Sequence, residues 1–191
     1  MLYLASASPR RAELLSQIGV QFKTIVADID ESAHAGESAQ ALALRLSREK
    51  ALKASQMLSN LQRDDLILAA DTLISVDDHI LGKPASQADC CNMLRKLSGR
   101  EHQVVSAIAV RNAQGEIAQQ SVLSTIYFRA LSDDDIERYS ASGEPMDKAG
   151  GYAIQGRAAI FIEHLDGSYS SVMGLPLFET AKLLTEFGYT I

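Results

Sequence analysis

The stretch "LILAADTLISV", residues 66–76, is apolar along most of its length and is interrupted by one acid, Asp71. A run of this length and composition is typical of a strand that is buried on both faces of a sheet. A carboxylate in such a strand must be paired, bound to a metal, or placed at the strand mouth beside a cleft. We therefore predict a buried strand, in which Asp71 is either catalytic or a structural residue that caps the following turn.

Helical and extended patterns alternate on both sides of this strand. The predicted helices span residues 8–19, 38–58, 86–99, 131–143 and 176–188. The other predicted strands are 1–5, 21–26, 102–110, 121–128 and 151–156, with a further pair within 158–174 that turns at Asp166-Gly167. Helices interleaved with strands, some of them joined as hairpins, predict an α/β fold with a mixed sheet. The 191 residues suit a single domain, 1–191, or two tightly joined lobes whose boundary the pattern does not mark.

Composition and charge narrow the range of partners. Lys and Arg number 18 against 24 Asp and Glu, for a formal net charge of −6, which argues against binding to duplex nucleic acid. We find no export signal and no apolar stretch long enough to span a membrane. Cys90 and Cys91 are adjacent, which suits neither a disulfide framework nor a zinc site. We therefore expect a cytoplasmic protein with no nucleic-acid or membrane partner.

The segment "SPRR" carries its charge in an unusual place. Ser8 and Pro9 are a typical helix start, but Arg10 and Arg11 put two cations where the helix dipole favours anions. The predicted helix that begins at Ser132 has the favourable order instead, with aspartates throughout its first turn. The two arginines therefore either bind an anion such as phosphate, together with the helix N–H groups, or are simply solvated.

Two lysines and an acidic loop add further candidates. Lys50 continues the row of Leu42 and Leu46 on a predicted helix, so its side chain either snorkels to solvent or reaches a phosphate in a cleft. Lys83, just before the next predicted helix, has the same two alternatives, solvent or a phosphate. Three loop carboxylates either help to bind a divalent cation or merely make the loop acidic: Asp28, Asp30 and Glu31. These residues indicate a phosphate-bearing substrate without selecting a reaction.

A series of short motifs supplies more specific evidence about the function. In chain order they are "LASASPRRAELL" (4–15), "DE" (30–31), "REKA" (48–51), "ADT" (70–72), "GKP" (82–84), "DKAGGYAIQG" (147–156) and "GSYSSVMGLP" (167–176). Together they resemble the Maf family of nucleoside triphosphate pyrophosphatases. The resemblance extends from residue 2 to about residue 185, and several motifs of this length in the right order are highly specific.

The resemblance implies an elongated mixed β-sheet flanked by helices, with two lobes and a cleft between them, as in inosine triphosphatase-like folds. It also implies hydrolysis of a nucleoside triphosphate to the monophosphate and pyrophosphate, with Mg²⁺ or Mn²⁺ as cofactor. By matching motifs, Asp71 would be the general base and a metal ligand, with Glu31 beside it. The residues implied to hold the triphosphate and to stabilise its charge are Ser6, Arg10, Arg11, Lys50 and Lys83.

The motifs "SPRR", "ADT" and "IQG" look like those of family members that act on dTTP and UTP. The resemblance therefore implies that Arg10, Thr72 and Gln155 set the base preference. Modified pyrimidine triphosphates are an alternative substrate class, because the same residues would read the base edge. A non-catalytic nucleotide-binding regulator of cell division, acting as a septum formation inhibitor, is the alternative function. The resemblance also suggests a homodimer.

Overall fold

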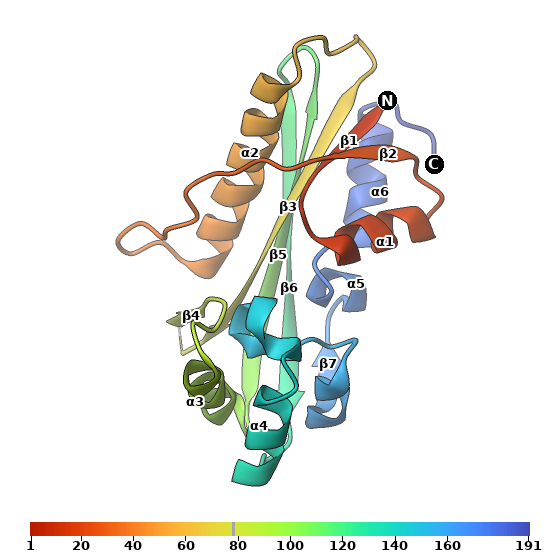
Figure 1. Ribbon diagram of the computed structural model, residues 1–191. Coiled ribbons are helices and arrows are strands. Elements are labelled where there is room, and N and C mark those ends of the chain that lie inside the picture. The colour runs from red at the N-terminus through yellow and green to blue at the C-terminus, as the bar shows by residue number, and fades with distance from the viewer. Residues whose placement is uncertain (78) are drawn as a thin grey trace.

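A mixed seven-stranded sheet forms the centre of the protein in the computed structural model, which describes residues 1–77 and 79–191 (Figure 1). The strand order is β2-β1-β3-β5-β6-β7, and β4 pairs with β3 outside this path. β1 lies parallel to β2 and β3, whereas the remaining pairs are antiparallel. The strands are β1 (Leu2–Ala5), β2 (Phe22–Ile25), β3 (Leu66–Val76), β4 (His79–Leu81), β5 (Glu101–Asn112), β6 (Ile117–Phe128) and β7 (Ile162–Asp166).

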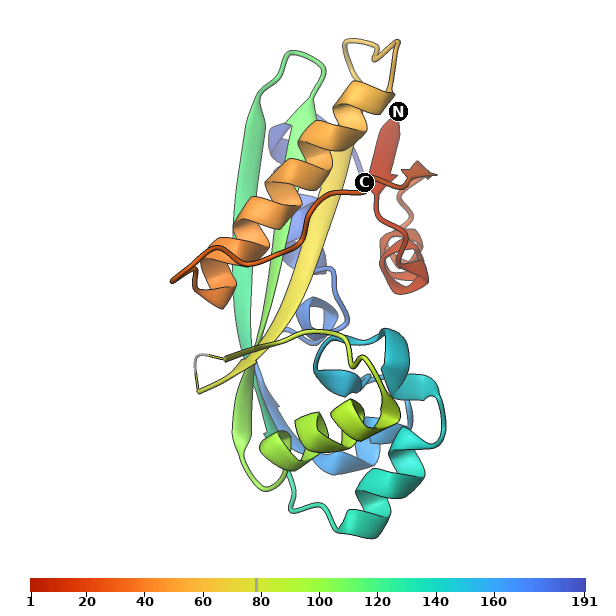
Figure 2. The ribbon, with the colours of Figure 1, turned by 60° about the vertical axis from the view of Figure 1, so that its left-hand side comes forward.

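Helices cover both faces of this sheet, which confirms the predicted fold class. The long strands β3, β5 and β6 run through the whole length of the molecule, with α2 against one face of the upper half and α6 against the other (Figure 2). The α-helices are α1 (Pro9–Gln17), α2 (Ala39–Met57), α3 (Gln87–Leu97), α4 (Asp133–Ser140), α5 (Tyr169–Val172) and α6 (Leu177–Glu186). Three 3-10 helices complete the chain: η1 (Glu144–Asp147), η2 (Ala149–Gly151) and η3 (Arg157–Phe161). None of the helices in the described ranges is long and apolar enough to cross a membrane.

The alternation of side chains along β3 decides which residues reach which face. Leu66 and Leu68 pack in the core beneath α1 and α6, whereas Ile67 and Ala69 pack in the core beneath α2. Both faces are therefore buried, as the apolar run predicts. Because successive residues of a strand point to opposite faces, Asp71 is directed to the α2 side and Thr72 to the α1 side.

A separate core fills the lower half of the molecule. The lower end of β3 packs there with α3 and α4, and Cys90 lies beside Leu94 and Leu97 on the buried face of α3, as the helical spacing predicts. Residues 66–70 of β3 belong to the upper cores and Ile74 to the lower one. Asp71 and Thr72 thus lie at the junction between the two halves.

The predicted strand at 151–156 is wrong. Gly150 and Gly151 have φ values of 66° and 71°, in the left-handed region, and form the turn η2. The Gly150 amide donates to the carbonyl of Gly82 at 2.9 Å, so this turn is held against the segment that precedes α3. The apolar side chain of Tyr152 then enters the lower core, where it needs no neighbouring strand.

The predicted hairpin within 158–174 is also wrong. Only its middle is extended, as β7, and the chain before it forms η3. After Gly167, whose φ is 127°, the Ser168 side chain accepts a hydrogen bond from the Ser171 amide and starts the short helix α5. Helix capping by serine therefore replaces the expected second strand.

Candidate active site

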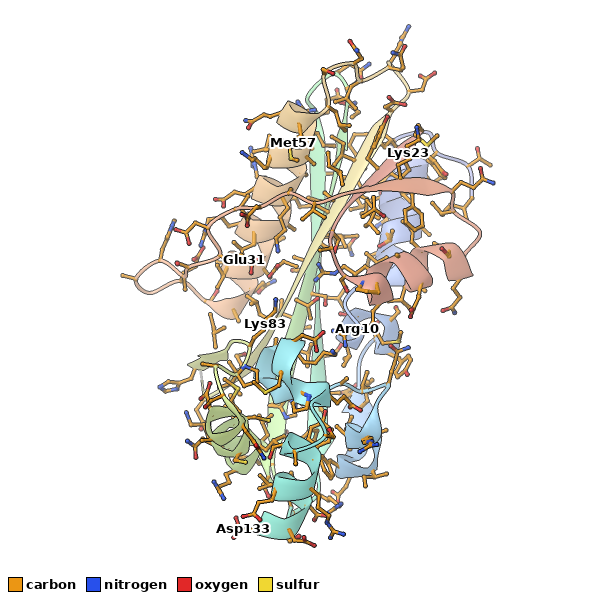
Figure 3. The ribbon with its side chains drawn as sticks, in the orientation of Figure 1. Arg10, Lys23, Glu31, Met57, Lys83 and Asp133 are labelled. Atoms are coloured by element: carbon orange, nitrogen blue, oxygen red, sulfur yellow. The ribbon has the colours of Figure 1, made fainter. Side chains whose placement is uncertain are left out.

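A cavity of about 830 Å³ lies where the two halves of the molecule meet. Its walls come from the β1–α1 connection, the β2–α2 loop, α2, the middle of β3, the segment after β4, η1 with the chain that follows it, and the end of α5 with the turn after it. Glu31, Lys83 and Arg10, from three separate segments, lie around this junction (Figure 3). The structure brings every predicted site residue to this cavity: Ser6, Arg10, Arg11, Glu31, Lys50, Asp71, Thr72, Lys83 and Gln155. Among the loop carboxylates, Asp28 also lines it, whereas Asp30 accepts a hydrogen bond from the Ser32 amide.

Lys50 joins two carboxylates on the α2 side of the cavity. Its Nζ lies 2.6 Å from Asp71 Oδ1 and 2.5 Å from Glu31 Oε1. Asp71 is only 6% exposed, whereas the side chain of Glu31 is about half exposed. Partial burial by itself would raise the pKa of Glu31, but its hydrogen bond to Lys50 and the charge of Lys50 outweigh this effect, so the pKa is lowered. The lysine that continues the leucine row of α2 therefore reaches inward to Asp71 rather than outward to solvent.

Arg11 is bound by the protein itself on the other side of β3. Its Nε donates to the Gly174 carbonyl at 2.8 Å, its Nη1 to Ser6 Oγ at 3.2 Å and its Nη2 to Thr72 Oγ1 at 3.3 Å. Gly174 has a φ of 114°, which favours glycine and turns its carbonyl towards the guanidinium. Burial lowers the pKa of Arg11, and the negative charge of Asp71 opposes that shift.

Thr72 belongs to the same network. Its Oγ1 lies 2.7 Å from Ser106 Oγ, and Ser106 Oγ in turn donates to the Ser171 carbonyl at 2.6 Å. The hydroxyl of Thr72 also donates weakly to the Gly174 carbonyl at 3.4 Å, so it is shared among Arg11, Ser106 and Gly174, three partners from this chain. Ser106 is fully buried and lies outside every sequence motif singled out above, so no local signal could have revealed it.

Arg10 differs from its neighbour. It lines the cavity and makes no hydrogen bond or ion pair to any residue in the described ranges, so its guanidinium donors remain available to an anion. Arg11 is thus bound to its own chain and Arg10 is not, and anion binding by the two arginines stays a prediction. Ser8 occupies the N-cap of α1, but its side chain makes no capping bond, and its amide donates to Ser6 Oγ at 3.1 Å.

The lower wall of the cavity, formed by the segment after β4 and by residues 147–155, holds two residues that the sequence predicted for the site and two that it did not. Lys83 and Gln155 are both exposed at the cavity. Lys148 and Asp147 line the same wall and form an ion pair with each other. The hydrogen bond and charge of Lys148, and to a smaller degree the charge of Arg10, lower the pKa of Asp147. A signal for Lys148 is present in the sequence, because it is the second residue of the motif "DKAGGYAIQG", directly after the acid Asp147.

The donor set suits a hard divalent cation. Asp71 and Glu31 each have an oxygen within 2.6 Å of Lys50 Nζ, so the two carboxylates converge on one point of the cavity. Magnesium typically takes one or two carboxylates and completes its shell with water and substrate phosphates. No cluster of three or more His, Cys, Asp or Glu side chains with metal-binding geometry occurs in residues 1–77 and 79–191. A cation held by Asp71 and Glu31 alone would have to complete its shell with water and phosphate oxygens.

Comparison with known proteins gives consistent matches over the full length. A family model described as Maf-like protein matches residues 1–187. A dTTP/UTP pyrophosphatase of Chromobacterium violaceum is 50% identical over 191 residues, which covers 100% of this chain and 96% of the relative. Another, of Methylobacillus flagellatus, is 52% identical over 191 residues, covering 100% and 94%. Among solved structures, a HAM1 protein from Coxiella burnetii matches with a TM-score of 0.51 and 18% identity, over 97% of this chain and 98% of that one. At this identity the likeness concerns the fold alone.

Proposed function

The chain belongs to the Maf family, and we propose that it hydrolyses dTTP and UTP to the nucleoside monophosphate and pyrophosphate. The observation that carries the proposal is Asp71, a nearly buried carboxylate in an apolar strand that faces a cavity lined with cations. A protein that only binds triphosphates gains little from a carboxylate at that position, because it repels the ligand. A hydrolase needs such a group to accept a proton from water.

The residues divide the chemistry between proton transfer and stabilisation of charge. Asp71 accepts a proton from the water whose oxygen attacks the α-phosphorus, while the bond from that phosphorus to the pyrophosphate oxygen breaks. Lys50 holds the carboxylates of Asp71 and Glu31 in place through its ion pairs. Arg10 and Lys83 bind the departing pyrophosphate and stabilise its growing negative charge.

A divalent cation is part of this proposal. Asp71 and Glu31 are the residues that would hold Mg²⁺ or Mn²⁺. When bound, the cation would neutralise phosphate charge and favour displacement at phosphorus. Before substrate arrives, Lys50 balances the same two carboxylates, which keeps Asp71 tolerable in its buried position.

We propose that Gln155 contacts the base directly, and that Arg10 contributes to the base preference by fixing the triphosphate and with it the position of the nucleotide. The polar side-chain groups of both residues make no hydrogen bond to other residues in the described ranges and are therefore available to the nucleotide. Thr72 acts differently, because its hydroxyl is already bound to Arg11 and Ser106. We propose that Thr72 contributes by fixing Arg11. A cytoplasmic location and a homodimeric state stay predictions.

Product analysis tests the reaction. Purified protein with Mg²⁺ or Mn²⁺ is given UTP, dTTP, CTP, GTP or ATP separately, beside Asp71→Asn and the matched control Asp64→Asn, an exposed acid far from the cavity. We expect UMP and dTMP with pyrophosphate, at a rate that falls by about 100-fold or more in Asp71→Asn and is unchanged in the control. Release of inorganic phosphate and a diphosphate would contradict the proposed reaction, and preferred turnover of a purine would contradict the base assignment.

The alternative function, regulation by nucleotide binding, predicts a different outcome. A nucleotide-binding regulator of cell division would bind these triphosphates without turning over any of the five. In that case Asp71→Asn should strengthen binding, because it removes a like charge from the cavity. Modified pyrimidine triphosphates are the next substrates to offer if the standard ones are bound but not hydrolysed.

A further inference from the structure

The loop that carries Gln155 is built around a glycine whose role is steric. Gly156 has φ −103° and ψ −156°, an extended backbone that any residue adopts, so glycine is not required there for conformational reasons. A Cβ at this position would instead overlap the carboxylate of Glu144. The absence of a side chain therefore allows the backbone of the loop to approach that carboxylate closely.

Glu144 is held on both of its oxygens. Oε1 accepts a hydrogen bond from the Tyr139 hydroxyl at 3.0 Å, and Oε2 accepts one from the Arg157 amide at 3.0 Å. Tyr139 comes from α4 and is only 4% exposed, so its ring provides a rigid support. Burial and the neighbouring carboxylate of Glu144 both raise the pKa of Tyr139, which keeps its hydroxyl protonated as a donor. The carboxylate cannot move away without losing both bonds.

This carboxylate is tied directly to the wall that faces the substrate. Arg157 lies two residues after Gln155, and the Gly156 amide donates to the Ala153 carbonyl at 3.0 Å, which closes a tight turn around Gln155. The Gln155 side chain has no hydrogen bond within residues 1–77 and 79–191, so no polar contact with the chain fixes its amide, and the backbone turn sets the point from which the side chain enters the cavity. Glu144 also begins η1, which leads into the cavity-lining residues 147–149.

We propose that Glu144, seated against Gly156, is a positioning residue that sets Gln155 for recognition of the pyrimidine base. This inference rests on the proposed function. We call the hydrogen bond from the Arg157 amide to the Glu144 carboxylate the tether. The tether acts on the lower wall of the cavity, whereas Asp71 and Lys50 lie on β3 and α2. Loosening the tether should therefore impair the choice of base and the affinity for UTP more than the chemical step.

The variants are Glu144→Ala, Glu144→Gln, Gly156→Ala and the double variant Glu144→Ala/Gly156→Ala. Glu137→Ala is the matched control, because Glu137 is an exposed acid on α4 whose side chain makes no hydrogen bond or ion pair within the described residues. For each variant, kcat and KM are measured with UTP and with CTP. We expect Glu144→Ala and Gly156→Ala each to lower the UTP-over-CTP ratio of kcat/KM about tenfold, mainly through KM for UTP. In both, kcat for UTP should stay within about threefold of wild type.

Two of these variants separate positioning from general damage. In Glu144→Gln the amide oxygen can still accept the hydrogen bond from the Arg157 amide, and the amide NH₂ can donate one to the Tyr139 hydroxyl. This variant should therefore retain most of the selectivity. The double variant should be no worse than Glu144→Ala, because the carboxylate that the new Cβ would meet is gone. Additive losses in the double variant, or an unchanged ratio in both single variants, would overturn the proposal.

Hydrogen exchange gives a readout that does not depend on activity. The Arg157 amide, which donates to Glu144, should exchange faster in Glu144→Ala and keep its wild-type rate in Glu137→Ala. An unchanged exchange rate in Glu144→Ala would show that the tether does not exist. If the wild type turns over neither UTP nor dTTP, the proposed function is wrong and the selectivity role is overturned with it, whereas the exchange rate still decides the tether.

Discussion

Arg10 and Arg11 are neighbours in the sequence, but the structure uses them in different ways. Arg11 satisfies two hydroxyls and a carbonyl of its own chain, so its charge is part of the framework around Thr72. Arg10 lines the cavity, and its side chain makes no hydrogen bond or ion pair to the residues that the structure describes. The unfavourable charge at the start of α1 is therefore offset in part by the protein and, on the proposed function, in part by the substrate.

This difference predicts opposite effects for two single substitutions. Arg10→Ala should lower kcat/KM for UTP by about 10- to 100-fold, the value of one charge-assisted hydrogen bond, and leave the urea midpoint unchanged. Arg11→Ala should destabilise the fold by about 2–3 kcal/mol, because it removes the three hydrogen bonds that a buried guanidinium donates to the Gly174 carbonyl, Ser6 Oγ and Thr72 Oγ1. Urea unfolding and steady-state kinetics on both variants check this. Equal losses of stability would show that Arg10 is also a structural residue.

At the scale of whole elements, a helix or strand can be predicted from the sequence when its own residues carry the pattern that determines it. β3 and α2 carry their own apolar pattern, and the predicted bounds 66–76 and 38–58 agree with the structure within one residue. Residues 151–174 carry apolar side chains too, but these pack into cores made by distant segments. Their backbone is set by left-handed glycines and by the Ser168 cap, which outweigh strand propensity.

The helix starts allow a matched test of capping. Ser132 Oγ accepts from the Asp135 amide and Asp135 bonds back to Ser132, a full capping box, whereas the side chain of Ser8 caps nothing. Ser132→Ala should therefore cost about 1 kcal/mol of unfolding free energy, and Ser8→Ala less than about 0.5 kcal/mol. Urea denaturation of the two variants gives both values. A larger cost for Ser8→Ala than for Ser132→Ala would contradict the assignment of the caps.

At the scale of the whole molecule, the cavity depends on contacts that no local pattern encodes. The residues predicted for the site were found through their motifs, and the alternation of β3 explains why Asp71 meets Lys50 and not Arg11. The partners that orient them lie far away in sequence, as Gly174 does from Arg11, or carry no distinguishing chemistry, as with Ser106. Such pairings become visible only when the fold is known.

His102 links the stability of the lower half to pH. Its ring is 2% exposed, its Nε2 lies 2.7 Å from the Tyr152 hydroxyl, and it packs edge-on against Phe128. The buried Nδ1 has no hydrogen-bond partner within the described residues, so nothing there would stabilise a protonated ring. Burial accordingly lowers the pKa of His102 from 6.5 to about 4.

The free energy of unfolding should therefore fall as the pH drops from about 6.5 to about 4. In that window the unfolded chain protonates His102 while the folded chain keeps it neutral, which gives a slope of up to about 1.4 kcal/mol per pH unit. Above pH 6.5 the residue is neutral in both states and contributes no slope.

Urea titrations between pH 4 and pH 6.5 should show the slope in the wild type and a flatter profile in His102→Phe. The substitution also leaves the Tyr152 hydroxyl unpaired, but that loss shifts the profile at every pH and does not change its slope. An identical slope in both proteins would mean that His102 is already protonated in the fold.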